Sequence, residues 1–205
     1  MYIYVKRIID FILSLIALII LSPLFLFLAI WIKFDSKGPV FFKQKRMGRD
    51  RTFFQIYKFR TMLAETPDDM PTHLLEAPDT FITKSGKFLR KTSLDELPQL
   101  INILKGEMAI IGPRPALWNQ EDLADERDKY GANDVLPGLT GWAQINGRDE
   151  LPIDVKAQLD GEYIQNMGFW FDLRCFFGTF LSILKSDGVV EGGTGTLEKN
   201  KNITK

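Results

Sequence analysis

The longest apolar stretch of the chain covers residues 11–32, which include no charged side chain. A helix of that length could cross the hydrocarbon core of a bilayer, which is about 30 Å thick. Ser22 and Pro23 interrupt the stretch near its middle. Because proline lacks a backbone donor and clashes with the preceding turn, the pattern predicts a membrane helix that bends at this pair.

Basic residues flank this helix on both sides. Lys6 and Arg7 precede it, and the residues that follow it include Lys33, Lys37, Lys43, Lys45 and Arg46. A spanning helix usually carries its positive excess on the cytoplasmic side alone. The two arms would measure roughly 21 and 14 Å, too short for either to span. We therefore predict a re-entrant helix-break-helix over residues 1–36, with Lys6 and Arg7 at the lipid interface.

The apolar stretch is also compatible with two alternatives to the re-entrant helix. A kinked helix that spans the membrane is the first, because such helices tolerate proline. A cleaved signal peptide is disfavoured, since the apolar run is too long and no small-residue cleavage site follows it.

Short runs rich in aromatic residues come next. Residues 40–46 and 53–60 are separated by a polar, glycine-containing stretch, which predicts a β-hairpin. Lys58 and Arg60 lie two residues apart, so we expect them on one face of the second strand. Residues 64–83 are acidic and contain prolines, which is typical of a surface loop; a short helix is expected near residues 73–76.

An amphipathic helix is predicted after Ser93, where apolar residues recur at helical spacing up to residue 104. Pro98 is tolerated only in a first turn, so the helix should begin between Ser93 and Asp95. Ser93 and Glu96 fit a capping box, and acidic residues favour helix N-termini in any case. The functional alternative is that Asp95 and Glu96 provide a nucleophile, a metal ligand or a base where helix amides bind phosphate.

Three further helices complete a mostly helical α+β fold: a charged one at residues 119–130, one at 155–167, and an aromatic one at 169–184. The last is either a core helix or an interfacial amphipathic helix. We predict a compact catalytic domain over residues 37–189, followed by a flexible glycine-rich tail at 190–205.

Composition narrows the chemistry. The chain has 205 residues, of which 45% are hydrophobic and 25% charged, as expected for a globular domain. Lys plus Arg and Asp plus Glu number 26 each, so no basic excess suggests nucleic acid. One cysteine and one histidine exclude a disulfide framework and a histidine-rich metal site. A metal here would be a hard cation such as Mg²⁺.

Three motifs occur in order: Ser-Leu-Asp-Glu-Leu-Pro-Gln at 93–99, Ile-Gly-Pro-Arg-Pro at 111–115, and Pro-Gly-Leu-Thr-Gly-Trp-Ala-Gln-Ile-Asn-Gly-Arg at 137–148. Together they closely resemble the bacterial sugar transferase family, the small monotopic phosphoglycosyl transferases that begin glycan assembly on polyprenol phosphate. The resemblance covers roughly residues 1–190. It also implies a re-entrant helix broken at a Ser-Pro pair, on the cytoplasmic face of the bacterial plasma membrane.

The resemblance further implies a mechanism. Asp95 would attack the β-phosphate of a UDP-sugar and release UMP, and polyprenol phosphate (undecaprenyl phosphate) would then displace the bound phosphosugar. Mg²⁺ would be held through Asp95, and Glu96 would act as a base or position other groups. The residues expected to bind substrate or phosphate are Lys58, Arg60, Arg90, Arg114, Gln144, Asn146, Arg148 and Asp160.

Two rival functions remain open at this point. The first is a non-catalytic, membrane-tethered scaffold in which the Asp-Glu pair is only a cap. The second is a membrane-bound nucleotide-sugar hydrolase that passes its phosphoryl intermediate to water. The sequence does not identify the sugar, and it leaves both a monomer and a homodimer open.

Overall fold

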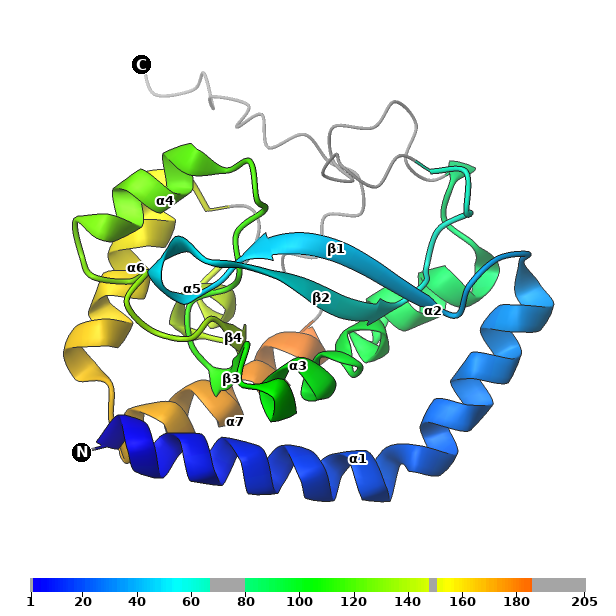
Figure 1. The fold of residues 1–205 in the computed structure, drawn as a ribbon, viewed down its shortest axis with the longest axis horizontal. Coiled ribbons are helices and arrows are strands. Elements are labelled where there is room, and N and C mark those ends of the chain that lie inside the picture. The colour runs from blue at the N-terminus through cyan, green and yellow to red at the C-terminus, as the bar shows by residue number, and fades with distance from the viewer. Residues whose placement is uncertain (1, 67–79, 148–150, 186–205) are drawn as a thin grey trace, which may run out of the picture.

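The chain is mostly helical, with a little sheet and a long apolar helix at its N-terminus. The computed structural model describes residues 2–66, 80–147 and 151–185. The helix α1 runs along one side of the molecule and bends, and the other elements lie on its concave side (Figure 1). The elements are, in order, α1 (Tyr2–Asp35), β1 (Phe41–Met47), η1 (Arg49–Arg51), β2 (Phe53–Phe59), α2 (Lys84–Lys91), η4 (Leu94–Glu96), α3 (Gln99–Lys105), β3 (Ala109–Ile111), α4 (Glu121–Asp128), β4 (Gly138–Thr140), α5 (Trp142–Ile145), α6 (Ile153–Asn166) and α7 (Phe169–Lys185).

Where a break was predicted, α1 continues as a single helix through Ser22 and Pro23. Pro23 lies inside the helix, and the Ser22 hydroxyl donates a hydrogen bond to the Ile19 carbonyl at 2.8 Å. Pro23 has no backbone N–H to donate to the Ile19 carbonyl, and the Ser22 hydroxyl supplies that hydrogen bond instead. Within the described part of the chain, α1 is the one helix that is long and apolar enough to cross a membrane.

Both arms of α1 pack on the rest of the protein. In the C-terminal arm, Leu28 and Ile32 are 1% exposed and form a core cluster with Phe59 and Leu89. Before the break, three side chains pack on a second cluster that joins β2 to α3. These are Ala17, Leu18 and Leu21. The helix α1 therefore supplies part of the hydrophobic core.

The predicted hairpin is confirmed as β1 and β2, which pair antiparallel with Phe41 opposite Phe59 and Met47 opposite Phe53. Asn102 of α3 joins the hairpin to the helix behind it. Its amide oxygen accepts from the backbone N–H of Tyr57 at 3.0 Å, and its amide nitrogen donates to the Gln55 carbonyl at 2.7 Å.

A second sheet was not anticipated. The strands β3 and β4 pair in parallel, with Ala109 opposite Gly138. A Cβ on Gly138 would lie 2.2 Å from the Gly112 nitrogen, so only glycine permits this approach. The glycines after Pro137 thus have a structural role, because they hold the chain at Gly112 in place.

The helices predicted at 119–130, 155–167 and 169–184 are confirmed as α4, α6 and α7. Cys175 of α7 is fully buried, as expected of a small hydrophobe. The same helix also exposes several apolar side chains: Phe169, Trp170, Phe176, Phe177, Phe180 and Leu181. The expected short helix near residue 73 and the tail at 190–205 lie outside the described residues.

The predicted capping box is wrong. Ser93 adopts a left-handed conformation, with φ 55°, and its side chain makes no cap hydrogen bond. The chain turns sharply there, forms the short 3-10 turn η4, and begins α3 only after Pro98. Because a left-handed residue redirects the chain, Glu96 does not fold back onto Ser93.

Lys6 and Arg7, predicted at the lipid interface, both bind protein groups. The Lys6 ammonium lies 2.7 Å from an Asp172 carboxylate oxygen and is 9% exposed. The Arg7 guanidinium donates to the carbonyls of Ile103 and Leu104 at 2.6 and 3.1 Å, at the C-terminal end of α3. A cation is favoured at that end of a helix. These contacts hold both residues against the protein, and the lipid-interface role of Lys6 and Arg7 stays a prediction.

Candidate active site

Asp95 and Glu96 lie side by side in η4, between α2 and α3. The left-handed turn at Ser93 places them there. Asp95 is 8% exposed, and the Glu96 side chain is 18% exposed. Two adjacent carboxylates at this depth would repel each other unless cations stood nearby.

Glu96 is fixed by two cations. Arg114 donates two hydrogen bonds to its carboxylate, at 2.8 and 3.4 Å, and the Lys58 ammonium donates another at 2.8 Å. Burial alone would raise the pKa of Glu96, but Arg114 and Lys58 hold that pKa well below its usual range. Glu96 is therefore an anion whose oxygens are already occupied.

The pKa of Asp95 is shifted in the opposite direction to that of Glu96. Burial raises the pKa of its carboxyl to about 6; Lys58 opposes the rise, Glu96 adds to it, and Arg90 and Arg114 oppose it. No group in the described ranges donates a hydrogen bond to this carboxylate. Its oxygens are thus free to attack an electrophile or to bind a cation.

Two arginines complete the cluster. Arg114 lies between Pro113 and Pro115, whose rings fix φ and make the turn stiff. Arg90, in the last turn of α2, donates from Nε to the Thr61 hydroxyl at 2.9 Å. With Lys58, these arginines give three cations around two carboxylates, and that balance suits an anionic ligand such as a diphosphate.

Arg60, although two residues from Lys58, does not join this cluster. It follows the end of β2, and its guanidinium donates to the carbonyls of Ser36 and Lys37, each at 2.8 Å. It is 4% exposed. Arg60 therefore fastens the end of α1 to the hairpin.

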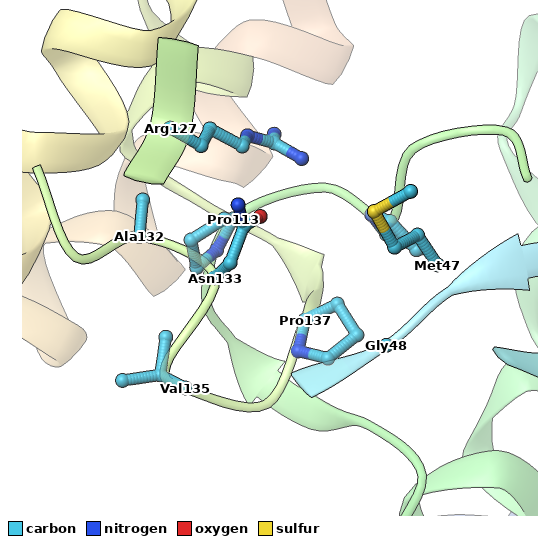
Figure 2. Close-up of a pocket in the computed structure, with 9 residues that line it drawn as sticks. Met47, Gly48, Pro113, Arg127, Ala132, Asn133, Val135 and Pro137 are labelled. Carbon is cyan, nitrogen blue, oxygen red and sulfur yellow. The ribbon is translucent and has the colours of Figure 1, made fainter. Parts of the chain in front are cut away.

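Asp160 also has a protein partner. Its carboxylate accepts from Arg127 Nε at 2.8 Å, and the two residues are 1% and 3% exposed. Figure 2 shows Arg127 near Pro113 and Asn133, with Met47 and Gly48 from the end of the hairpin strand on the other side of a small cavity. This cavity measures about 10 Å³, which is room for one water and not for a nucleotide.

The remaining candidates come from the third motif. Gln144 donates from its amide to the Leu139 carbonyl at 3.3 Å, and its buried amide oxygen has no hydrogen-bond partner within the described ranges. Asn146 is exposed and donates to the Trp142 carbonyl at 2.8 Å. Arg148 lies outside the described residues. Gln144 thus keeps a free acceptor, whereas the Asn146 amide group closes the end of α5.

Sequence reasoning missed a further polar cluster formed by Asp10, Asp172 and Tyr163. These residues are 4%, 9% and 1% exposed. Asp172 stands 162 positions after Asp10, so no local spacing connects them. The signal available in the sequence was an acid inside an otherwise aromatic helix, since a buried charge requires a partner.

An ionised Asp95 should destabilise the folded protein. Burial raises its pKa from 3.8 to about 6, so the folded state keeps a proton that the unfolded chain has lost. The resulting penalty is absent below pH 4, grows as the pH rises through 6, and reaches about 3 kcal/mol. Asp95→Asn should therefore raise the free energy of unfolding at pH 8 and leave it unchanged near pH 4. Denaturant titration in detergent, without metal, measures both values; an equal gain at the two pH values would contradict this account.

Comparison with known proteins agrees with the geometry. Residues 1–186 match the family described as bacterial sugar transferase. A Bacillus subtilis protein named uncharacterized sugar transferase EpsL is 40% identical over 195 residues, which are 95% of this chain and 94% of that protein. The Rhizobium meliloti exopolysaccharide production protein ExoY is 34% identical, over 89% of this chain and 87% of its own length.

Other relatives are longer. The Escherichia coli UDP-glucose:undecaprenyl-phosphate glucose-1-phosphate transferase is 41% identical over 85% of this chain, but the matched region is only 39% of that protein. A Salmonella typhimurium undecaprenyl-phosphate galactose phosphotransferase is 36% identical over 90% of this chain and 41% of its own length. The chain thus spans about two fifths of these named enzymes.

Proposed function

Because the chain belongs to the bacterial sugar transferase family, we propose that it moves a sugar-1-phosphate from a UDP-sugar to polyprenol phosphate, as the first membrane step of glycan assembly. Two of the longer relatives have undecaprenyl phosphate in their names, and one of these two also has UDP-glucose. The observation that carries the proposal is Asp95, a buried carboxylate with free oxygens beside Lys58, Arg90 and Arg114. The long apolar helix at the N-terminus is consistent with an acceptor substrate that carries a lipid.

The reaction takes two steps. An Asp95 oxygen attacks the β-phosphorus of the UDP-sugar, and the bond from that phosphorus to the bridging oxygen breaks. UMP leaves with the bridging oxygen, and the sugar phosphate stays on Asp95 as an acyl phosphate. A phosphate oxygen of polyprenol phosphate then attacks the same phosphorus. This second attack restores the Asp95 carboxylate and yields polyprenol diphosphosugar.

Glu96 acts here as a positioning group. A carboxylate whose pKa is depressed by Arg114 and Lys58 is a poor proton acceptor. The Glu96 carboxylate instead binds Arg114 and Lys58, each at 2.8 Å. It thereby holds these two cations next to Asp95, where the diphosphate would lie. Preorganised charges of this kind stabilise a phosphoryl transition state without reorganisation.

Mg²⁺ would be coordinated in this site by ligands from both the protein and the substrate. Within the described ranges no group of three or more Asp, Glu, His or Cys side chains could hold a metal unaided. Asp95 supplies one free carboxylate, and Mg²⁺ commonly binds one or two carboxylates plus substrate phosphates and water. When bound, the ion would offset the diphosphate charge.

UMP release from UDP-sugars tests the proposal. The purified protein in lipid nanodiscs should release UMP only with the matching UDP-sugar and Mg²⁺, and polyprenol phosphate should sustain turnover. No release from any UDP-sugar would favour the scaffold. Sustained release without polyprenol phosphate would favour the hydrolase. A panel of UDP-sugars in the same assay identifies the donor.

The membrane arrangement belongs to this proposal. A re-entrant α1, with both ends on the cytoplasmic face and the exposed aromatic face of α7 at the interface, would bring polyprenol phosphate to the site. The bend at Pro23 and the basic flanks support it.

Topology can be measured by cysteine labelling. In a chain with Cys175 replaced, Tyr2→Cys and Ser36→Cys should react with an impermeant reagent only after the cells are opened. Pro23→Leu restores the backbone donor, so α1 could straighten to spanning length and shift position 2 towards outside labelling. Outside labelling of Tyr2→Cys without Pro23→Leu would mean a spanning helix.

A further inference from the structure

A buried ion cluster joins the N-terminal arm of α1 to α7. The Lys6 ammonium lies 2.7 Å from Asp172 and 3.5 Å from Asp10, and the Tyr2 hydroxyl donates to Asp172 at 2.7 Å. Lys6, Asp10 and Asp172 are each at most 9% exposed. Buried ion pairs add little net stability compared with apolar packing, but they offset the cost of desolvation only when the charged groups are closely and correctly oriented. The cluster therefore fixes where the arm of α1 lies against the protein.

The same cluster holds the strand β3. The backbone N–H of Ile110 donates to the Asp10 carboxylate. The Tyr163 hydroxyl has one proton and two acceptors, an Asp172 oxygen at 2.8 Å and the Ile111 carbonyl at 3.2 Å. Two consecutive residues of β3, Ile110 and Ile111, thus contact side chains from α1 and α6.

From β3 the chain leads directly to the active site. Ile111 is followed by Gly112, Pro113 and Arg114, and the prolines on either side of Arg114 make this turn stiff. Arg114 reaches Glu96 at 2.8 Å. A shift of β3 would therefore be transmitted to the arginine.

We propose that Tyr163 and Lys6 are positioning residues, which set the place of Arg114 beside Glu96 through β3. Neither touches Glu96 or Asp95. The seating of the membrane helix is thereby coupled to the geometry of the phosphate site. The kinetic part of this inference rests on the proposed function.

A double-mutant cycle tests the coupling. Tyr163→Phe removes one hydroxyl and keeps the ring, so we expect kcat/KM for UMP release to fall about tenfold; Arg114→Lys should lower it about 100-fold. If Tyr163 acts through Arg114, the double variant should be no worse than about 100-fold down. A loss near 1,000-fold, the product of the two, would overturn the proposal. A second cycle, with Lys6→Met and Arg114→Lys, tests in the same way whether Lys6 of α1 acts through Arg114.

Cys175→Ala is the matched control. Cys175 packs in the same core cluster as Tyr163 and Ile111, so its truncation loosens the packing and leaves the polar contacts intact. Its effect on kcat/KM should multiply with that of Arg114→Lys. If the effects of Cys175→Ala and Arg114→Lys on kcat/KM did not multiply, loosened packing alone would explain the result, and the specific role of Tyr163 would be refuted.

Amide hydrogen exchange at residues 109–115 gives a readout that does not depend on activity. Tyr163→Phe and Lys6→Met should each speed exchange at Ile110 and Gly112 about tenfold, more than Cys175→Ala does. Unchanged exchange in both variants would refute the positioning role, even if no UDP-sugar proved to be a substrate. Absence of UMP release with faster exchange would instead count against the proposed function alone.

Discussion

Asp95→Asn should abolish turnover, with kcat for UMP release at least about 1,000-fold lower than in the unmodified protein. An amide cannot form the acyl phosphate, and it binds Mg²⁺ more weakly than a carboxylate does. The fold should survive, because the substitution removes a buried charge to which no group among the described residues donates a hydrogen bond. Trapping with radiolabelled UDP-sugar should show the covalent phosphosugar on the unmodified chain and not on this variant.

Asp125→Asn provides the control for that experiment. Asp125, on α4, has an exposed side chain and pairs with Arg51 of η1, so the same chemical change should leave the rate within about twofold. If Asp95→Asn kept more than a tenth of the rate, the nucleophile would have to be another residue.

Glu96→Gln should lower kcat/KM about 100-fold, the second largest effect we expect. The variant leaves Lys58 and Arg114 without their shared anion, so both cations would lose their fixed positions. Stability should fall by about 3 kcal/mol, since a partly buried charge pair is broken from one side. A helix cap would cost only about 1 kcal/mol and would leave the chemistry intact.

The two roles can be separated by experiment. Denaturant unfolding gives the stability change, and single-turnover kinetics give the rate of the first step. A stability loss near 1 kcal/mol with an unaltered first step would return Glu96 to a purely structural role.

Much of the fold could be predicted because its signals are local. The apolar helix α1, the hairpin and the helices α4, α6 and α7 each follow from the spacing of apolar residues and from turn residues. The sheet of β3 and β4 could not, because each strand has three residues and each owes its place to a partner nearly thirty residues away.

The site divides in the same way. The adjacency of Asp95 and Glu96 is visible in the sequence, but the left-handed Ser93 that orients them is not, since serine seldom adopts that conformation. Strand periodicity suggested that Lys58 and Arg60 act together. The strand ends at Phe59, and Arg60 turns to Ser36 and Lys37 instead.

The packing of α1 has a consequence for how this protein could be altered. Leu28 and Ile32 belong to the same core cluster as Phe59 of the hairpin, and Arg7 satisfies carbonyls at the end of α3. Replacing the first 35 residues by an unrelated membrane anchor would leave apolar surface and helix carbonyls uncovered on the remaining chain. The apolar helix α1 and the rest of the chain thus cannot be exchanged as separate modules.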